Sequence, residues 1–357
     1  MLRKTCWSVV ALLLAVGTLT AAEPAKSLKK GTPDLKSAGP LAFGPEGILF
    51  VGDPQGAAIF AIDTQDRSAS PASGPLKVAK VDEQIASLLG TTAQQILIND
   101  LAVNPASGAA YLSVARGKGP DAAALIVRVD RSGKPTVLTL ENVPFAKASL
   151  PNASQKQRQE AITDLAYVDG KVLVAGLSNE QFASTLRAIP FPFSDADKGT
   201  SVEIYHGAHG KFETHSPVRT FVPYEISGQA HLLAAYTCTP LVKFPLSDLK
   251  PGAHVKGTTI AELGNRNRPL DMIVYQKGGK DYILMANSSR GVMKITTDGI
   301  DKIEGITNRI SGTAGLTYDT IDHLKGVVQL DKLGKDNALL LIRADDGSLN
   351  LDTVPLP

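Results

Sequence analysis

The residues of this chain that are best suited to chemistry are concentrated in one short stretch. IYHGAHGKFETHSPVRTF, residues 204–221, contains three of the six histidines, His206, His209 and His215. Imidazole nitrogens and a cysteine thiolate are preferred ligands of Zn and Cu. With Cys238 further along the chain, the stretch is a candidate metal site; the alternative interpretation is a solvated polar loop.

A second set of polar residues recurs at the starts of similar segments. Asp100 lies in NDLAV, Asp164 in TDLAY and Asp271 in LDMIV, while Arg219 holds this place in VRTFV. Such residues meet at one opening if their segments line a common channel. Asn287 lies in a later turn of the segment that contains Asp271, and we expect this turn at the same opening. Carboxylates with an amide oxygen suit Ca²⁺. Alternatively, the aspartates cap turns by accepting backbone N–H groups, and the arginine neutralises them.

The elements that must position these residues are strands. The chain has short β-branched runs separated by Gly, Asn, Asp and Pro, with almost no helical periodicity, which indicates an all-β fold. Three apolar runs separated by two turns recur six times. The units begin near Gly39, Ile98, Ile162, Ser216, Arg268 and Gly315.

Repeated antiparallel units of this kind predict a six-bladed β-propeller, with seven blades as the alternative. Each small sheet has two apolar faces, so it becomes stable only when neighbouring sheets cover both of them. In such a ring, the inner strands of the blades start at one mouth of a central channel. We expect residues 39–357 to form the propeller and residues 23–38 to supply a ring-closing strand that pairs with the C-terminal SLNLDTVPL.

The segments GPEGILFVGD and GGKDYILMAN resemble blades of the NHL and SMP-30/gluconolactonase-like propellers. This resemblance implies a propeller over nearly the whole chain. The SMP-30 family uses a divalent metal to polarise a lactone carbonyl and activate water. By resemblance, Asp271 matches the late Asp of its ligand set and Asn99–Asp100 its Asn–Asp pair, whereas the position of its Glu falls near Ala38.

The N-terminus has the pattern of a cleavable signal peptide over residues 1–22, with Arg3 and Lys4 before an apolar run too short to span a membrane. We therefore expect a secreted or periplasmic protein without a membrane span. Of the 37 Lys and Arg residues two lie in this leader, so 35 basic residues balance 35 acidic ones in the rest of the chain. That balance argues against nucleic acid as a partner.

The leading functional hypothesis is an exported propeller that binds a small molecule, a metal or a protein partner at one channel mouth. A metal-dependent hydrolase or lactonase of SMP-30-like type is the second hypothesis, and a protein-interaction scaffold is the third. The sequence does not decide whether the protein is an enzyme. It leaves the cofactor open, with Ca, Zn or Cu as the divalent candidates.

Overall fold

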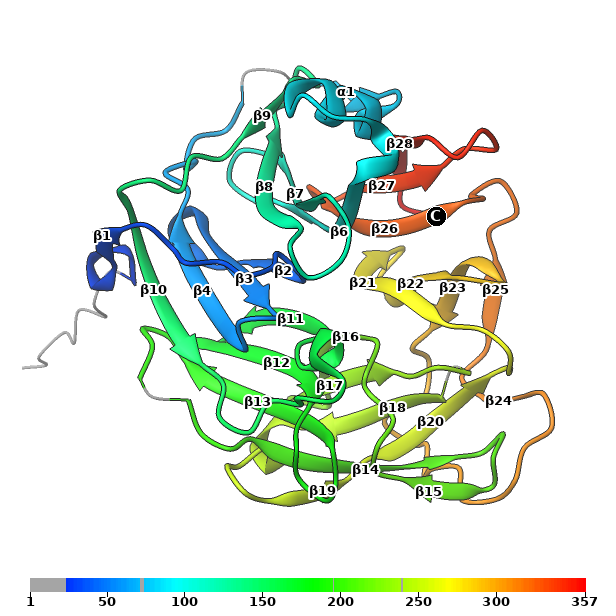
Figure 1. The fold of residues 1–357 in the computed structure, drawn as a ribbon. Helices are drawn as coiled ribbons and strands as arrows, with labels where there is room; N and C mark the ends of the chain where they lie inside the picture. The colour runs from blue at the N-terminus through cyan, green and yellow to red at the C-terminus, as the bar shows by residue number, and fades with distance from the viewer. Residues whose placement is uncertain (1–23, 71–73, 195, 239) are drawn as a thin grey trace, which may run out of the picture.

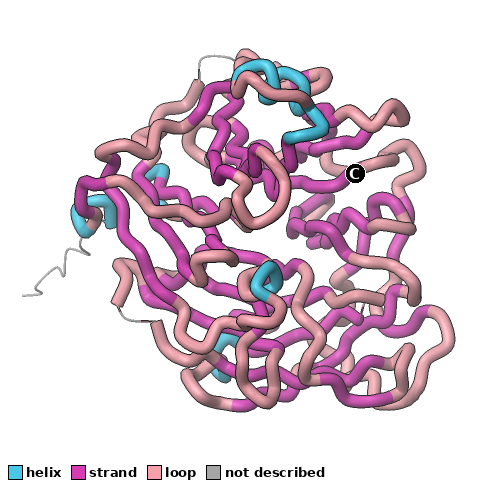
Figure 2. Tube along the Cα trace, viewed as in Figure 1, coloured by secondary structure: helices cyan, strands magenta, loops and turns pink. Residues whose placement is uncertain are grey.

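The computed structural model describes residues 24–70, 74–194, 196–238 and 240–357, so the predicted signal peptide lies outside the described residues. Strands dominate the described chain (Figure 2). They form six small sheets around a central channel (Figure 1), which confirms the six-bladed β-propeller and not the seven-bladed alternative. Within these ranges, helical structure is limited to α1 and five 3₁₀ turns: α1 (Val81–Leu88), η1 (Pro24–Ser27), η2 (Pro45–Gly47), η3 (Ala93–Gln95), η4 (Arg158–Glu160) and η5 (Leu246–Asp248).

We number the blades by the order of their innermost strands along the chain. From the channel outward, blade one contains β2 (Leu41–Phe43), β3 (Ile48–Asp53), β4 (Ala58–Asp63), β10 (Val143–Ser149) and β1 (Lys29–Gly31). Blade two contains β6 (Ile96–Val103), β7 (Ala110–Arg116), β8 (Ala123–Val129) and β9 (Pro135–Val137). Blade three contains β11 (Asp164–Val168), β12 (Lys171–Leu177), β13 (Ser184–Pro190), β14 (Thr200–His206) and β15 (Lys211–Glu213), with β19 (His254–Lys256) parallel to β14.

The other three blades follow the same plan. Blade four contains β16 (Thr220–Ile226), β17 (Gln229–Ala235), β18 (Pro240–Pro245), β20 (Thr258–Leu263) and β24 (Thr313–Gly315). Blade five contains β21 (Pro269–Lys277), β22 (Lys280–Asn287), β23 (Gly291–Thr296) and β25 (Tyr318–Thr320). Blade six contains β26 (Val327–Leu333), β27 (Asn337–Arg343), β28 (Leu349–Pro355) and β5 (Lys77–Val78).

The middle strands of the blades explain why the apolar runs are continuous rather than alternating. Every residue of β3 and of β4 is buried, because both faces of the sheet pack against a neighbouring blade. The hydrophobic clusters accordingly lie between blades. One of them combines Phe50 of blade one with Leu165 and Val174 of blade three.

The order of the blades around the ring differs from their order along the chain. Blade two lies between blades one and six, because the Val103 N–H of β6 bonds Asp331 of β26 and the Leu41 N–H of β2 bonds Asp100 of β6. A hydrophobic cluster likewise joins blades two and six. Blade one has blade three as its other neighbour, so the order around the ring is one, three, four, five, six, two (Figure 1).

Ring closure also differs from the expectation. β1 pairs with β10 in blade one, so the strand of the described residues 24–38 does not close the ring against the C-terminus. The outer edge of β28 is instead covered by β5, and the Leu76 N–H bonds Thr353 Oγ1 at 2.8 Å. The chain then passes through α1 into blade two and returns to blade one as β10, so segments distant in sequence hold blades one, two and six together.

The start of the sixth unit was predicted wrongly. Gly315 ends β24, a fifth strand on the outer edge of blade four, and the inner strand of blade six is β26. Gly315 has a φ of +77°, and a Cβ at this position would lie 2.1 Å from the Ile260 carbonyl oxygen. This glycine therefore allows β24 to approach β20 and does not mark the beginning of a blade.

Candidate functional site

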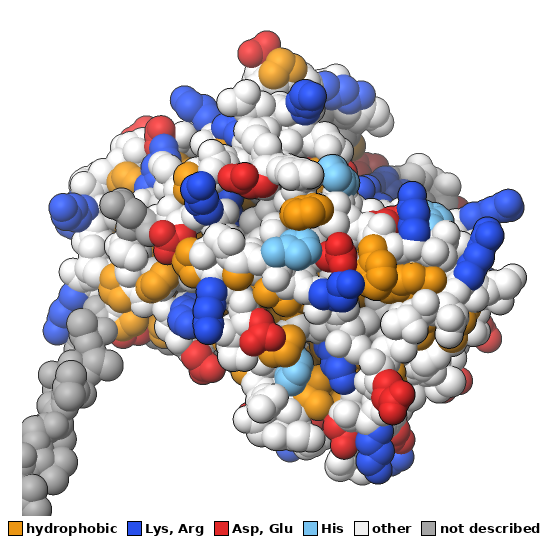
Figure 3. All heavy atoms as spheres, turned by 90° about the horizontal axis from the view of Figure 1, so that it is seen from below, with side chains coloured by type: hydrophobic (Ala, Val, Ile, Leu, Met, Phe, Trp, Pro, Cys, Tyr) orange, Lys and Arg blue, Asp and Glu red, His pale blue; other side chains and the backbone are white. Residues whose placement is uncertain are grey.

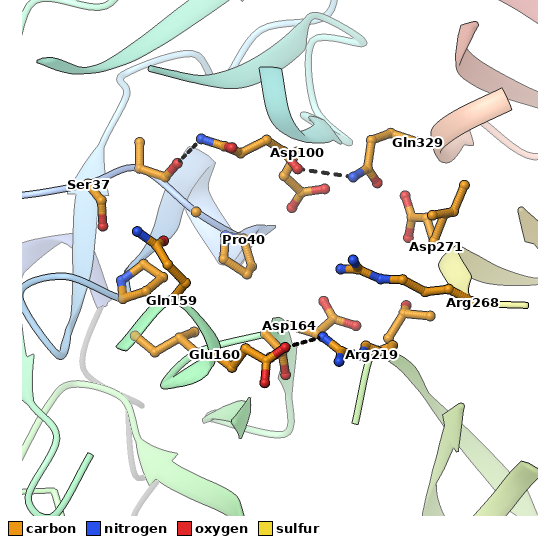
Figure 4. A pocket seen from close by; sticks show the side chains of 18 residues that line it. Ser37, Pro40, Asp100, Gln159, Glu160, Asp164, Arg219, Arg268, Asp271 and Gln329 are labelled. Atoms are coloured by element: carbon orange, nitrogen blue, oxygen red, sulfur yellow. Dashed lines mark hydrogen bonds and ion pairs between the residues drawn. The ribbon is translucent and has the colours of Figure 1, made fainter. Parts of the chain in front are cut away.

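Three aspartates form the floor of a cavity at one mouth of the channel. Asp100 of β6, Asp164 of β11 and Asp271 of β21 line a cavity of about 370 Å³ at the mouth where the inner strands start, and they also line a second cavity of about 400 Å³ on the other side. The three side chains therefore separate the two cavities. We call them the channel floor and the first cavity the mouth cavity (Figure 4).

Each carboxylate of the channel floor links two blades. One oxygen accepts the N–H of the next residue in its own strand, at 2.8 Å in all three cases. The other accepts an N–H of the inner strand of a neighbouring blade, from Leu41 to Asp100, from Phe221 to Asp164 and from Leu330 to Asp271, at 2.7–2.8 Å. Asp331 of β26, the residue after Leu330, makes the same kind of link: its oxygens accept the N–H groups of Lys332 in its own strand and of Val103 in β6.

Enclosure by protein makes the charged form of these carboxylates costly. Desolvation raises the pKa of Asp164 to about 7 and that of Asp331 to about 6, although the backbone N–H donors act in the opposite direction. Desolvation, with repulsion from the other channel carboxylates, raises the pKa of Asp100 and Asp271 well above the ordinary range. Part of the channel floor is therefore protonated near neutral pH.

The predicted place of Arg219 is off by one residue. Thr220 occupies the position equivalent to the three aspartates, because Phe221 is the residue that bonds Asp164. Arg219 lies one step closer to the mouth, where its Nη1 forms an ion pair with Glu160 Oε1 at 2.7 Å. Its Nε also donates to Thr237 Oγ1 in the turn between β17 and β18.

A second arginine enters the mouth cavity without a partner. Arg268, just before β21, extends its guanidinium over the cavity (Figure 4). It is exposed and makes no side-chain hydrogen bond or ion pair with the described residues. Desolvation and the nearby charge of Arg219 lower the pKa of Arg268, while Glu160 opposes this effect.

Amide side chains complete the wall of the mouth cavity. Asn99 donates to the Ala38 carbonyl at 2.8 Å, and Gln329 donates to the Asn99 carbonyl at 3.0 Å. Gln159 lines the same cavity from η4, the 3₁₀ turn before blade three. The cavity thus combines guanidinium, amide and carboxylate groups.

Asn287 does not line the mouth cavity. Its side chain is 4% exposed, and its Oδ1 accepts the N–H groups of Ser289 and Arg290 in the turn between β22 and β23. Its Nδ2 donates to Asn267 Oδ1 at 2.9 Å. Asn287 therefore stabilises a turn and is not among the residues that line the mouth cavity.

The structure brings together three of the four residues predicted as metal ligands. One ligand atom from each of His206, His209 and Cys238 lies within 4.8 Å of the other two. We call these residues the His–Cys cluster. It joins the outer edge of blade three to the turn between β17 and β18 of blade four. His215 is not part of it, since it is exposed and its Nδ1 contacts Thr214 Oγ1.

Two glutamates, the partly buried Glu213 and the buried Glu262, flank the His–Cys cluster. Glu213 Oε2 contacts His206 Nδ1 at 3.0 Å, and its Oε1 contacts His209 Nδ1 at 2.6 Å. Burial acts to raise the pKa of Glu213, but hydrogen bonds from His206, His209 and Ser216 hold it well below its usual range. Glu262 of β20 accepts the Gly207 N–H, and burial raises its pKa.

Sequence reasoning missed several of these residues. Glu160 and Arg268 precede the inner strands of blades three and five, so a search of the residues before each recurring aspartate could have found them. Gln329 was missed because the sixth unit was started too early. Nothing in the sequence indicated that Glu213 contacts the two histidines or that Glu262 accepts the Gly207 N–H, because these positions depend on outer-strand pairing.

The surface has no large region of a single charge on the face shown in Figure 3. Basic and acidic side chains are interspersed there, and histidine side chains reach the same face. In the described part of the chain, no helix is long and apolar enough to cross a membrane.

No protein-family model and no curated protein sequence matches this chain. Similar solved structures include PQQ-bound aldose sugar dehydrogenase from Streptomyces coelicolor, at 14% identity over 91% of this chain and 96% of that one, with a TM-score of 0.40. A putative oxidoreductase (glucose dehydrogenase) from Thermus thermophilus has 11% identity over 92% and 99%, with a TM-score of 0.38. A chain of a mitotic checkpoint complex has 9% identity over 98% and 99%, with a TM-score of 0.41. Similarities this weak carry no argument about activity, so function has to be argued from the residues themselves.

Proposed function

We propose that this protein is an exported β-propeller that binds a small polar molecule with an anionic group in the mouth cavity. The observation that supports this proposal is the unpartnered guanidinium of Arg268 above the cavity. A planar guanidinium with free donors binds carboxylate or phosphate in a bidentate manner. An anion at this point also offsets the repulsion between Arg268 and Arg219.

The remaining groups of the cavity favour hydrogen-bond donors on the rest of the ligand. The channel floor presents carboxylate oxygens, and Gln159 and Gln329 add amide groups. A molecule with an acid at one end and hydroxyl or ammonium groups at the other matches this arrangement. Export is part of the proposal and is supported by the leader pattern of residues 1–22.

A metal-dependent hydrolase or lactonase of SMP-30-like type is the second hypothesis. It is favoured by the positions of Asn99, Asp100 and Asp271 around one cavity. Two features count against it. Ala38 stands where the resemblance requires Glu, and both oxygens of Asp100 and Asp271 already accept backbone N–H groups. A bound metal would have to compete with these donors or share the remaining lone pairs.

Thermal unfolding and calorimetric titration with small acids test the proposal. The acids are of three kinds: amino acids, sugar acids and dicarboxylates. Each acid is compared with its uncharged amide or alcohol. We expect at least one acid to bind and its uncharged counterpart to bind about tenfold or more weakly, because each charge-assisted hydrogen bond contributes about 1.5–3 kcal/mol. Arg268→Gln should abolish this preference. Arg266→Gln, two residues away and outside the cavity, is the matched control. Absence of binding by every acid, or equal binding by Arg268→Gln, would contradict the proposal.

A further inference from the structure

The His–Cys cluster is small enough to surround a single ion. His206 is the last residue of β14, His209 lies in the loop between β14 and β15, and Cys238 lies in the turn between β17 and β18. Two ligands that are each about 2.0–2.3 Å from one zinc ion are at most about 4.6 Å apart. The 4.8 Å limit on the separation of the three ligand atoms is therefore close to the size of a coordination sphere.

Glu213 holds both imidazoles by the same ring atom. Its two oxygens contact His206 Nδ1 and His209 Nδ1, so Nε2 is the ring nitrogen left free in each histidine. The ring centroids lie 3.9 Å apart, which keeps the two imidazoles side by side. A carboxylate that binds the distal nitrogen of a metal-binding histidine fixes its tautomer and orientation. Glu213 thus has the place of such an orienting group.

Two polar atoms beside the cluster lack a partner. His206 is 2% exposed, and its Nε2 has no hydrogen-bond partner among the described residues. Glu262 is 1% exposed, and its Oε2 is also unpartnered there, while its Oε1 accepts the Gly207 N–H. A buried polar atom without a partner lowers the stability of the folded state. A cation coordinated by His206 Nε2 satisfies the first atom and attracts the negative charge of Glu262.

We propose that His206, His209 and Cys238 bind a transition-metal ion of borderline softness, Zn²⁺ or a copper ion, with Glu213 as a positioning residue. Two imidazole nitrogens and one thiolate form a three-ligand set that leaves a coordination position open. Binding deprotonates Cys238 and releases its thiol proton to solvent. Hard cations such as Ca²⁺ are disfavoured, because they require a shell of oxygen ligands.

The cluster adjoins the mouth cavity but is independent of its ligand. The N–H of Cys238 donates to the Asn267 carbonyl at 2.8 Å, and Asn267 precedes Arg268. Arg219 of the cavity donates to Thr237, the residue before Cys238. The turn that supplies the thiolate therefore contacts the wall of the mouth cavity, although the metal ligands belong to neither the wall nor the floor.

The test is titration of the chelator-treated, tag-free protein with Zn²⁺, and separately with Cu²⁺, in competition with a chromophoric chelator. We expect one equivalent of the preferred metal to bind to the wild-type protein. Cys238→Ser and His206→Gln should each weaken binding by about 100-fold or more. His215→Gln is the matched control from the same loop and should bind as the wild-type protein does. Co²⁺ used as a spectroscopic probe should give a thiolate-to-metal charge-transfer band that is absent from Cys238→Ser.

Glu213→Gln tests the positioning role separately. Loss of a carboxylate that orients metal ligands typically costs about 10–100-fold in metal affinity. We expect a loss in this range with the cobalt charge-transfer band retained, because the thiolate is still present. Should His206→Gln fail to fold, the partly exposed and nearly isosteric Cys238→Ser still decides the question. Failure of the wild-type protein to bind one equivalent, equal binding by Cys238→Ser, or loss of binding only in Asp271→Asn would overturn the proposal.

Discussion

The channel floor and the His–Cys cluster both gather potential metal ligands, but they use their lone pairs differently. Each carboxylate of the channel floor uses one oxygen for its own strand and the other for the next blade. In the His–Cys cluster, Glu213 fixes Nδ1 of both histidines, and the buried Nε2 of His206 has no partner among the described residues. The channel floor therefore joins blades, whereas the His–Cys cluster retains a nitrogen, His206 Nε2, that can coordinate a metal ion.

This difference shows that residue type alone is a poor guide to a binding site. Three carboxylates around a channel resemble a cation site until their hydrogen bonds are assigned. Once each oxygen has a backbone donor, the linking of neighbouring blades accounts for their presence. The more informative observation is a ligand atom that is buried, oriented by a neighbour and still without a partner.

Removal of a carboxylate from the channel floor should have the largest effect on stability. Asp164→Ala leaves the N–H groups of Leu165 and Phe221 without their acceptor, at about 1–3 kcal/mol each. We expect the free energy of unfolding in denaturant to fall by about 2–4 kcal/mol. Asp121→Ala, in an exposed turn of blade two, is the control and should change it by less than about 0.5 kcal/mol. Equal small changes in both variants would mean that the floor does not link blades.

Cys238→Ser should separate metal binding from folding. Cys238 is partly exposed, so without metal we expect the serine variant to unfold within about 0.5 kcal/mol of the wild-type protein. Zinc at about 100 times the wild-type dissociation constant should stabilise the wild-type protein by about 2.7 kcal/mol and the variant by no more than about 0.4 kcal/mol. The measurement is denaturant unfolding with and without zinc. An equal zinc effect on both proteins would remove Cys238 from the ligand set.

A more gradual effect should appear on varying pH. The pKa values of Asp164, about 7, and Asp331, about 6, lie above the value of about 3.8 for an unfolded aspartate. The folded state therefore binds more protons than the unfolded state between about pH 4 and pH 7. Since stability falls with pH in such a range, these groups should lower stability as pH rises from about 4 to about 7.

Thermal unfolding between about pH 5 and pH 8 checks this trend. Asp164→Asn removes one titrating group, so its melting temperature should fall less steeply with pH than that of the wild-type protein. A wild-type melting temperature that rises steadily across this interval would contradict the raised pKa values of the channel floor.

The sequence predicted the blades better than their arrangement. Asp100, Asp164 and Asp271 aligned correctly because each begins the same apolar pattern, and His206 and Cys238 were grouped by the ligand chemistry of their side chains. Arg219 was misplaced by one residue, because VRTFV has no aspartate to set its register. The ring order could not be derived from the sequence, because blades that look alike do not specify their neighbours. That order depends on side-chain packing between blades and on contacts such as Val103 with Asp331.

The measurement that tests the central comparison most directly is an anomalous-difference map, at the zinc absorption edge, from crystals of the protein equilibrated with zinc. We predict one peak bounded by His206, His209 and Cys238 and no peak on the channel axis. A peak among Asp100, Asp164 and Asp271 with none at the His–Cys cluster would show that backbone hydrogen bonds do not prevent the channel floor from binding a metal, and would contradict the distinction between the two regions.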